Sequence, residues 1–322
     1  MGGLKNKKIL VTGGAGFIGS HIVDRLVKEG ARVIVLDNLI SGKIENIKHN
    51  LDKIKFIKKD IREDEALEEA LEGVELISHQ AALRSVPKSV EKPFIYHQVN
   101  VTATLKLFLK AKKMDVKRIV FASSSSVYGE RTTFPQKETD LPKPISPYAA
   151  TKLLAEYYAY VFSKLYNLEV VCLRYFNVFG PRQSLDDEYA VVIPKFINCL
   201  LNNQPTPIYG DGYQERDFTY IDNVVEANIL ALIKKGIEGE VFNIGQGKPQ
   251  SINNLAKILN KIMKKNIEAI FLPKRAGDVR KTHADISKAK KLLKWQPKID
   301  FFTGLKKTVD WFSYKKNNEY PY

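Results

Sequence analysis

The chain has 322 residues, 44% of them hydrophobic, and a formal net charge of +15. This length and hydrophobic content suffice to bury one or two cores, and no apolar run approaches the roughly 20 residues that a membrane-spanning helix needs. Residues 1–8 are polar and lack the apolar core of a signal peptide. We therefore expect a soluble, cytoplasmic protein without a membrane partner.

The positive charge is dispersed rather than gathered in one basic arm. Lysines recur in 5–8, 257–265 and 288–294, mostly on polar faces of predicted helices, so a solvated surface is favoured over a nucleic-acid partner. The positive electrostatic potential of such a surface would also favour an anionic substrate. The two cysteines, Cys172 and Cys199, stand in apolar surroundings, which predicts core thiols and neither a disulfide nor a metal site.

Short β-branched runs alternate with helical patterns in the first half of the chain. An amphipathic helix follows the first run from Phe17 and is stopped by Gly30. Strands that alternate with helices predict the α/β class, with a Rossmann-type doubly wound parallel sheet. The predicted strands are 8–11, 32–36, 55–57, 76–79, 118–122 and 170–174.

After Asn177 the pattern becomes irregular. Turn signals at 180–181, 205–207 and 210–212 surround a predicted helix at 191–201. A helix at 222–234 and a strand at 240–244 are suited to rejoin the main sheet. We predict a main domain of residues 1–177 and about 219–246, and a smaller α/β lobe of about 178–218 and 247–322.

A glycine-rich loop joins the first strand to the first helix. Gly13, Gly16 and Gly19 recur at three-residue spacing. Because glycine has no side chain, the backbone there can approach a pyrophosphate. The N-terminus of the helix adds free amides and the positive end of its dipole. Glycine also serves a tight turn for steric reasons alone. The strand before the loop, the helix after it and Asp37 about 20 residues on favour dinucleotide binding.

Asp37 ends the second predicted strand and indicates which dinucleotide is bound. Its carboxylate can accept hydrogen bonds from the ribose hydroxyls of NAD and would repel the 2′-phosphate of NADP. Asp37 could instead form a turn with Asn38, and Lys43 leaves NADP as an alternative. Asp60 could bond the adenine amino group or cap a helix that begins near Arg62.

A tyrosine and a lysine lie one helical turn apart in the segment 145–152. Ser146 is placed to cap a helix with Pro147 in its first turn, so Tyr148 and Lys152 share a face. We expect the ammonium to lower the tyrosine pKa, so that a phenolate can act as a base. Such pairs are common on ordinary helices, so the pair needs a partner segment.

The partner segment is a run of four serines after the strand 118–122. Hydroxyl groups there lie beyond the carboxyl end of a strand, where open α/β sheets bind ligands. One of them could hold a substrate hydroxyl against the phenolate. Ser123 and Ser125 could equally bond to their own backbone.

Together, the segments 12–19, 123–129, 148–152 and 173–180 resemble the extended short-chain dehydrogenase/reductase superfamily over nearly the whole chain. The segments 79–83, 174–177, 210–212 and 318–322 are similar to those of nucleotide-sugar 4-epimerases, which act on UDP-hexoses and UDP-N-acetylhexosamines. The resemblance implies catalysis by Ser124, Tyr148 and Lys152. It also implies an NAD-binding main domain and a lobe that binds a UDP-sugar.

By this resemblance, NAD stays bound while the C4 hydroxyl proton passes to Tyr148 and the C4 hydride to the cofactor. The 4-keto sugar then rotates, and the hydride returns to its other face. Further cofactor contacts are assigned to Gly13, Gly16, Phe17, Ile18, Asp37, Asn38, Gly42, Asp60, Ile61, Gln80, Ala81, Ala82, Asn100, Ser123, Tyr148, Lys152 and Tyr175.

The resemblance also assigns substrate contacts. Arg216 and Arg275 would bind the diphosphate, and Thr282 takes the position that gates sugar size, where threonine leaves room for an acetamido group. UDP-GlcNAc and UDP-GalNAc are therefore predicted, with UDP-glucose and UDP-galactose also accepted. Arg84 departs from the glycine of several N-acetyl-specific relatives. The other assigned residues are Ser85, Ser124, Ser125, Ser126, Tyr148, Asn177, Val192, Lys195, Tyr209 and Asp278.

Rival functions remain at this point. Ser125 and Ser126 stand where dehydratases or decarboxylases carry acidic residues, which disfavours both reactions. A UDP-glucuronate 4-epimerase stays open because Arg84 could meet a carboxylate; so do a simple reductase and a non-enzymatic NAD-binding protein. The apolar helices 104–113 and 153–165 predict a homodimer, although their faces could be buried within one chain.

Overall fold

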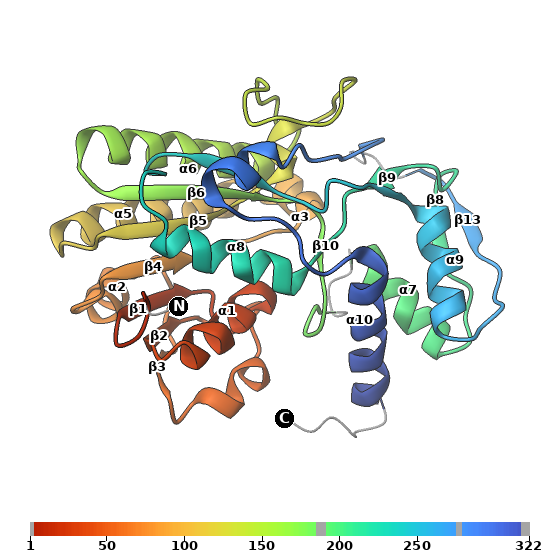
Figure 1. Ribbon diagram of the computed structural model, residues 1–322, viewed down its shortest axis with the longest axis horizontal. Coiled ribbons are helices and arrows are strands. Elements are labelled where there is room, and N and C mark those ends of the chain that lie inside the picture. Colours follow the sequence, from red (N-terminus) through yellow and green to blue (C-terminus); the bar gives the residue numbers. More distant parts are fainter. Residues whose placement is uncertain (1–2, 185–190, 275–278, 317–322) are drawn as a thin grey trace.

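The computed structural model describes residues 3–184, 191–274 and 279–316. Within them, a seven-stranded parallel sheet runs in the order β11-β6-β5-β4-β1-β2-β3 (Figure 1). The chain starts in the middle of the sheet and winds outward to both edges, which confirms the predicted doubly wound fold. The strands are β1 (Lys8–Thr12), β2 (Arg32–Leu36), β3 (Ile54–Ile57), β4 (Leu76–His79), β5 (Arg118–Ser124), β6 (Glu169–Tyr175) and β11 (Val241–Ile244).

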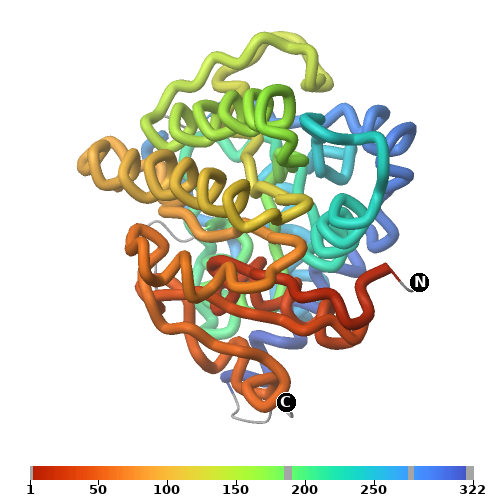
Figure 2. Tube along the Cα trace, turned by 90° about the vertical axis from the view of Figure 1, so that its left-hand side faces the viewer, coloured from red at the N-terminus to blue at the C-terminus, as the bar shows by residue number. Residues whose placement is uncertain are grey.

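Helices cover both faces of the sheet. On one face lie α1 (Phe17–Lys28) and α8 (Ile221–Ile233), and on the other α2 (Asp64–Leu71), α5 (Ala103–Lys113) and α6 (Pro147–Leu165), of which α5 and α6 run side by side in Figure 2. Successive side chains of a strand point to opposite faces. Accordingly, Ile9 and Val11 of β1 join the core under α1, whereas Leu10 joins the core under α2 and α5. Each helix thus buries its apolar stripe on the sheet.

The smaller lobe lies beyond the carboxyl ends of the strands (Figure 1). Its described residues form three two-stranded pairs, β7 with β10, β8 with β13 and β9 with β12, together with three helices that pack on one another. The division into two domains stays a prediction. The elements are β7 (Val178–Phe179), α7 (Val192–Leu201), β8 (Pro207–Tyr209), β9 (Glu215–Arg216), β10 (Thr219–Tyr220), β12 (Gln250–Ser251), α9 (Ile252–Ile262), β13 (Ile270–Leu272) and α10 (Phe301–Lys316).

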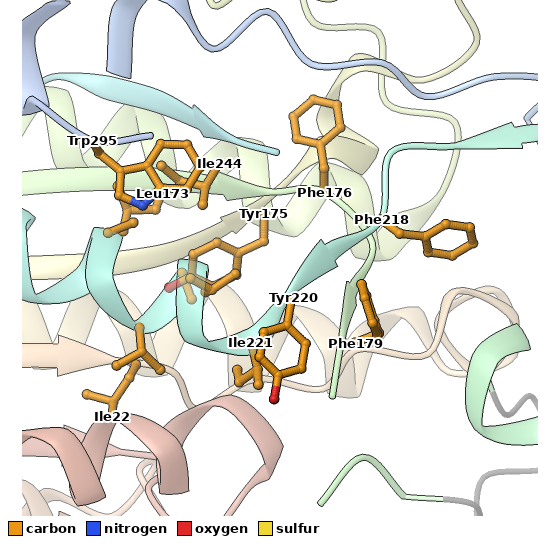
Figure 3. Close-up of a cluster of buried hydrophobic side chains, with 14 of the residues drawn as sticks. Ile22, Leu173, Tyr175, Phe176, Phe179, Phe218, Tyr220, Ile221, Ile244 and Trp295 are labelled. Carbon is orange, nitrogen blue, oxygen red and sulfur yellow. The ribbon is translucent and has the colours of Figure 1, made fainter. Parts of the chain in front are cut away.

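An aromatic cluster joins the lobe to the sheet (Figure 3). The ring centroid of Phe179 lies 6.3 Å from that of Phe218 and 5.6 Å from that of Tyr220, and all three side chains are buried. Trp295 is also buried and donates from Nε1 to the carbonyl of Asn223 on α8 at 2.9 Å. Residues near both lobe segments are therefore fixed to the sheet by buried contacts.

The remaining short elements lie mostly around the carboxyl ends of the strands. They are η1 (Ile44–Asn46), η2 (Lys48–Asn50), α3 (Val86–Glu91), α4 (Pro93–His97), η3 (Gln98–Thr102), η4 (Ser125–Tyr128) and η5 (Ala289–Leu293), of which η3 and η5 are π-helical. Among the described residues, every helix is too short or too polar to cross a membrane.

Candidate active site

A large cavity, with a volume of about 1120 Å³, is lined by the carboxyl ends of the sheet strands and by the lobe. Doubly wound sheets bind their ligands at this end. The cavity brings together most residues predicted from the sequence: Gly13, Gly16, Phe17, Ile18, Asp37, Asn38, Gly42, Asp60, Ile61, Gln80, Ala81, Ala82, Arg84, Ser123, Ser124, Ser125, Ser126, Tyr148, Lys152, Tyr175, Asn177, Arg216 and Thr282.

Five predicted residues in the described part of the chain do not line the cavity: Ser85, Asn100, Val192, Lys195 and Tyr209. Ser85 caps α3 by accepting a hydrogen bond from the Lys88 amide. Val192 and Lys195 are half-buried on α7, and Nζ of Lys195 lies 3.3 Å from Oη of Tyr209. Asn100 is buried behind the cavity wall. Arg275 and Asp278, together with the motif at 318–322, lie outside the described residues.

The glycine loop is shaped for close approach of a phosphate group. Gly13 has φ +67°, and a Cβ there would come within 2.7 Å of the Ala81 amide nitrogen. A Cβ on Gly19 would come within 2.1 Å of the Gly13 carbonyl oxygen, so the helix can pack against the loop only if residue 19 has no side chain. Both glycines are required by the backbone, and the first turn of α1 is left open to the cavity.

Asp37 is positioned at the end of β2 by two backbone amides. Its Oδ2 accepts from Ala15 at 2.9 Å and its Oδ1 from Leu39 at 2.8 Å. Burial raises the pKa of Asp37, and these two bonds oppose that shift. Each carboxylate oxygen keeps a second lone pair for a hydroxyl group at the cavity surface, so the residue fits a ribose.

Asp60 does not cap a helix. A helix does begin near Arg62, because α2 starts at Asp64, but its N-cap is Glu63, so the alternative that Asp60 caps it is wrong. Oδ1 of Asp60 instead accepts from the Arg62 amide at 2.9 Å, Oδ2 accepts from Asn38 at 2.7 Å, and bonds from the Arg62 side chain lower its pKa to about 2. The carboxylate is therefore charged and held at the cavity wall.

A neutral histidine supports the loop that follows β4. His79 is buried, with Nδ1 2.7 Å from Oγ1 of Thr12 and Nε2 2.9 Å from Oγ1 of Thr104. Because the Thr104 hydroxyl already donates to the carbonyl of Asn100 at 2.8 Å, Nε2 must donate and Nδ1 must accept. Burial lowers the pKa of His79 to about 3.

Asn100 clamps the same loop. Its Oδ1 accepts from the amide of Leu83, and its Nδ2 donates to the carbonyl of Leu83, each at 2.9 Å. Nδ2 also donates to Oγ1 of Thr151 on α6 at 3.1 Å. Asn100 therefore joins the loop after β4 to the helix that carries Tyr148.

Gln80 and Tyr175 are joined by a residue that the sequence did not indicate. The Tyr175 hydroxyl lies 3.1 Å from Oδ1 of Asn228 and 3.3 Å from Oε1 of Gln80, and Nε2 of Gln80 donates to Oδ1 of Asn228 at 3.2 Å. Asn228 lies on α8 and is fully buried. An asparagine inside a largely apolar helix forms no motif, so only the packing of α8 reveals this role.

The start of α6 is fixed by two serines. Ser146 caps the helix by accepting from the Ala149 amide at 3.2 Å, as predicted. The amide of Tyr148 donates to Oγ of Ser89 at 3.1 Å, and Ser89 is buried on α3. Ser89 was missed because a serine on another helix leaves no spacing signal.

Tyr148, Ser124 and Lys152 meet at the cavity wall. The Ser124 hydroxyl hydrogen bonds to Tyr148. Nζ of Lys152 donates to the carbonyl of Ala122 at 2.8 Å, and burial lowers the pKa of Lys152 to about 8. Burial raises the pKa of Tyr148, opposed by Ser124 and by the charge of Arg84, so the prediction that Lys152 sets a lowered tyrosine pKa is wrong.

The opposite wall of the cavity comes from the lobe. Oγ1 of Thr282 donates to Oδ1 of Asn177 at 2.9 Å and accepts from the Asp217 amide at 3.0 Å. Arg216 is buried, and its Nη1 donates to the carbonyl of Glu215 at 2.9 Å. Segments that are far apart in the chain are thus brought to one side of the cavity.

Several other lining residues were not predicted, among them Val86 and Glu91 on α3, Arg182 after β7, and Trp311 on α10. Each becomes part of the cavity only through the packing of the lobe and of α3 against the sheet. Among the described residues, no group of three or more His, Cys, Asp or Glu is placed to hold a metal ion.

Comparison with known proteins identifies the family. The model of the NAD dependent epimerase/dehydratase family matches residues 9–245. The chain belongs to this family. The predicted superfamily and the predicted cofactor, NAD, are thereby confirmed, and the cradle around Gly13 and Asp37 fits that cofactor.

Three relatives are named as UDP-sugar 4-epimerases and differ in the sugar that their names give. The UDP-N-acetylglucosamine 4-epimerase from Methanobrevibacter ruminantium M1, solved in complex with UDP-N-acetylmuramic acid, is 43% identical, with a TM-score of 0.93 over 97% of this chain and 100% of that one. The Thermotoga maritima UDP-glucose 4-epimerase with UDP-glucose is 42% identical, with a TM-score of 0.92 over 96% and 99%. A UDP-glucuronate 4-epimerase of Thermodesulfobacterium geofontis is 39% identical over 94% and 95%.

Proposed function

We propose that this enzyme interconverts UDP-GlcNAc and UDP-GalNAc by NAD-dependent epimerisation at C4, and that it also accepts UDP-glucose and UDP-galactose. The observation that carries the choice of sugar is the wall formed by Thr282 and Asn177. The hydroxyl of Thr282 is held by two hydrogen bonds. We infer that this small side chain leaves room for an acetamido group.

Tyr148 is the proposed base and acid at the C4 hydroxyl. Oγ of Ser124 accepts from the amide and the hydroxyl of Ser126 at 3.2 and 2.9 Å, which leaves its own proton for Tyr148 or for the sugar hydroxyl. The positive charge of Arg84 stabilises a phenolate. Lys152, one helical turn further along α6, is proposed to bind the cofactor. When bound, NAD supplies the reversible acceptor for the C4 hydride.

The lobe is proposed to hold the nucleotide while the sugar turns. Arg216 at the cavity wall can bind the diphosphate through its guanidinium group, as can Arg275 outside the described residues. Lys195 and Tyr209 are proposed for the uridine side of this anchor. A firmly held nucleotide and a loosely held sugar allow the 4-keto intermediate to present its other face to the hydride.

The test is NMR of the purified protein with UDP-GlcNAc and, separately, UDP-glucose, without added NAD. Formation of the C4 epimer without net NADH supports the proposal. The variant Thr282→Tyr should lower kcat/KM for UDP-GlcNAc at least about tenfold more than for UDP-glucose, because an aromatic ring takes the acetamido space. Thr282→Val is the matched control, since it removes the hydroxyl and keeps the volume. Equal losses for both substrates in Thr282→Tyr would contradict the argument.

A second candidate is UDP-glucuronate 4-epimerisation. Arg84 lines the cavity and acts electrostatically on Tyr148, so its charge lies near the reacting sugar and could pair with a C5 carboxylate. The same NMR experiment with UDP-glucuronate decides between the two. Conversion of UDP-glucuronate alone would replace the N-acetylhexosamine proposal.

We further propose a homodimer formed through α5 and α6. The outer face of α6 exposes Leu154, Tyr157, Val161 and Leu165, with 41%, 56%, 39% and 76% of their surface accessible, and Leu109 on α5 is 50% exposed. Neighbouring exposed apolar side chains of this kind are typical of protein–protein interfaces. In the dimer, α5 and α6 of one protomer would pack against α5 and α6 of its partner and form a four-helix interface.

The proposed location is the cytoplasm. Cys172 and Cys199 are free thiols, and Cys172 is buried. Free thiols suit the reducing conditions of that compartment.

A further inference from the structure

Three residues of α6 at successive turns meet three successive residues at the end of β5. Tyr148 hydrogen bonds to Ser124, and Lys152 donates to the carbonyl of Ala122 at 2.8 Å. One turn further, Glu156 accepts a short hydrogen bond from Oγ of Ser123. The proposed function uses the first two contacts and leaves the third unexplained.

Glu156 is bound on its other side by an arginine of the neighbouring strand. Nε and Nη2 of Arg174 donate to the two Glu156 carboxylate oxygens at 2.9 and 2.7 Å, and both side chains are only 4% exposed. Arg174 is the partner of Ser123 in the β5–β6 register, and its guanidinium stacks 4.7 Å from the centre of the Tyr128 ring. Glu156 is therefore held by β5 and β6 at once.

A buried ion pair of this kind contributes little to stability. The desolvation of both charges roughly offsets their attraction, and apolar residues of similar volume often do as well or better. The pair does fix the orientation of the helix. Because the carboxylate is bound in a bidentate manner and contacts two strands, the helix can take only one rotational position about its axis. The helix that it orients is the one that carries Tyr148 and Lys152.

We propose that Glu156 is a positioning residue of the active site, which together with Arg174 fixes α6 over the end of β5 and keeps the neighbouring Lys152 ammonium charged. This inference rests on the proposed function. Glu156 can act on the charge of Lys152 because side chains four residues apart on a helix are neighbours. Burial lowers the pKa of Lys152, and the charge of Glu156 is the largest effect that opposes this shift.

The experiment compares the holoenzyme with the variant Glu156→Gln, which keeps the shape and removes the charge. The control is Glu169→Gln on the same strand as Arg174. Glu169 also pairs with a buried arginine, Arg118, at 2.6 Å, but at the opposite end of β6. For each protein we would measure the bound NAD per chain, the pH profile of kcat and the free energy of unfolding against pH.

Glu156→Gln should bind NAD and lose about ten- to a hundredfold in kcat, because the reacting groups are misplaced. The alkaline limb of its kcat profile should move down by roughly one pH unit, as Lys152 loses its neighbouring anion. Glu169→Gln should leave that limb in place. A kcat profile of unchanged shape in Glu156→Gln, or unchanged kcat, would overturn the proposal.

Unfolding provides a readout that needs no turnover. The folded-state pKa of Lys152, about 8, lies below its ordinary value of 10.5, so stability gained from its deprotonation appears as pH rises above about 8. In Glu156→Gln this gain should begin at lower pH. If the wild type converts no UDP-sugar, the proposed function fails while this comparison still tests Glu156. If Glu156→Gln does not fold, the double variant Glu156→Leu with Arg174→Met removes both charges and must show the same earlier gain.

Discussion

The buried neutral imidazole of His79 makes the stability of the fold sensitive to mild acid. Its folded-state pKa, lowered to about 3 by burial, lies far below the ordinary value of 6.5. As pH falls below 6.5, the unfolded chain binds a proton that the folded chain excludes, so stability is lost with falling pH until about pH 3. The threonine hydroxyls on both ring nitrogens support the neutral form.

The size of the effect follows from the two pKa values. Between pH 7 and pH 5, His79 should lower the free energy of unfolding by about 2 kcal/mol. At lower pH the loss should approach about 1.4 kcal/mol for each pH unit. The variant His79→Gln, which can still donate to Thr104, should lose this slope. Urea unfolding of both proteins with saturating NAD, at pH values from 7 to 4, measures the difference.

The control for this experiment is His97→Gln. His97 is exposed on α4, so this variant makes the same substitution outside the buried site of His79. If His79→Gln and the wild type lose stability in parallel between pH 6 and pH 4, His79 is protonated in the folded state and the proposed tautomer is refuted.

Three further variants test the site and the assembly. Tyr148→Phe should lower the epimerisation rate by about 10²–10⁴-fold while NAD stays bound, as measured by NMR and by nucleotide release after denaturation; a rate near that of the wild type would exclude Tyr148 as the base. Asp37→Ala should shift the affinity ratio towards NADP by on the order of tenfold in calorimetric titration of the apoprotein, because the carboxylate that repels a 2′-phosphate is gone, and an unchanged ratio would assign selectivity elsewhere. Tyr157→Glu should convert a dimer to a monomer in light scattering, because a charge enters the apolar face of α6, and an unchanged mass would place the interface elsewhere.

The parts of the fold that could be predicted from the sequence depend on short-range patterns. The glycine loop, the helix that follows it and Asp37 at the end of β2 all lie within the first βαβ unit, where spacing determines geometry. The cap at Ser146 is equally local. Beyond these, the link from Tyr148 to Ser124 came from family resemblance, and the structure places both at the cavity.

What the sequence could not predict depends on pairing between distant segments. Strand β5 continues through Ser123 and Ser124, predicted as a polar loop, because they pair with Arg174 and Tyr175 of β6. Asn228 joins the cavity wall only through the packing of α8. The pKa of Tyr148 was misjudged for the same reason: a helical spacing shows that Lys152 is near, but not that burial outweighs it.

The position of β11 bears on how this protein is made. Strand β6 pairs with β5 on one side, but its other edge stays open until residues 241–244 have been synthesised, after much of the lobe. A nascent chain therefore carries an exposed, apolar parallel edge for that whole interval, and such edges invite association with other chains. Fragments that end before residue 241 should aggregate rather than fold, and fast translation or chaperone binding during this interval should raise the yield of active protein.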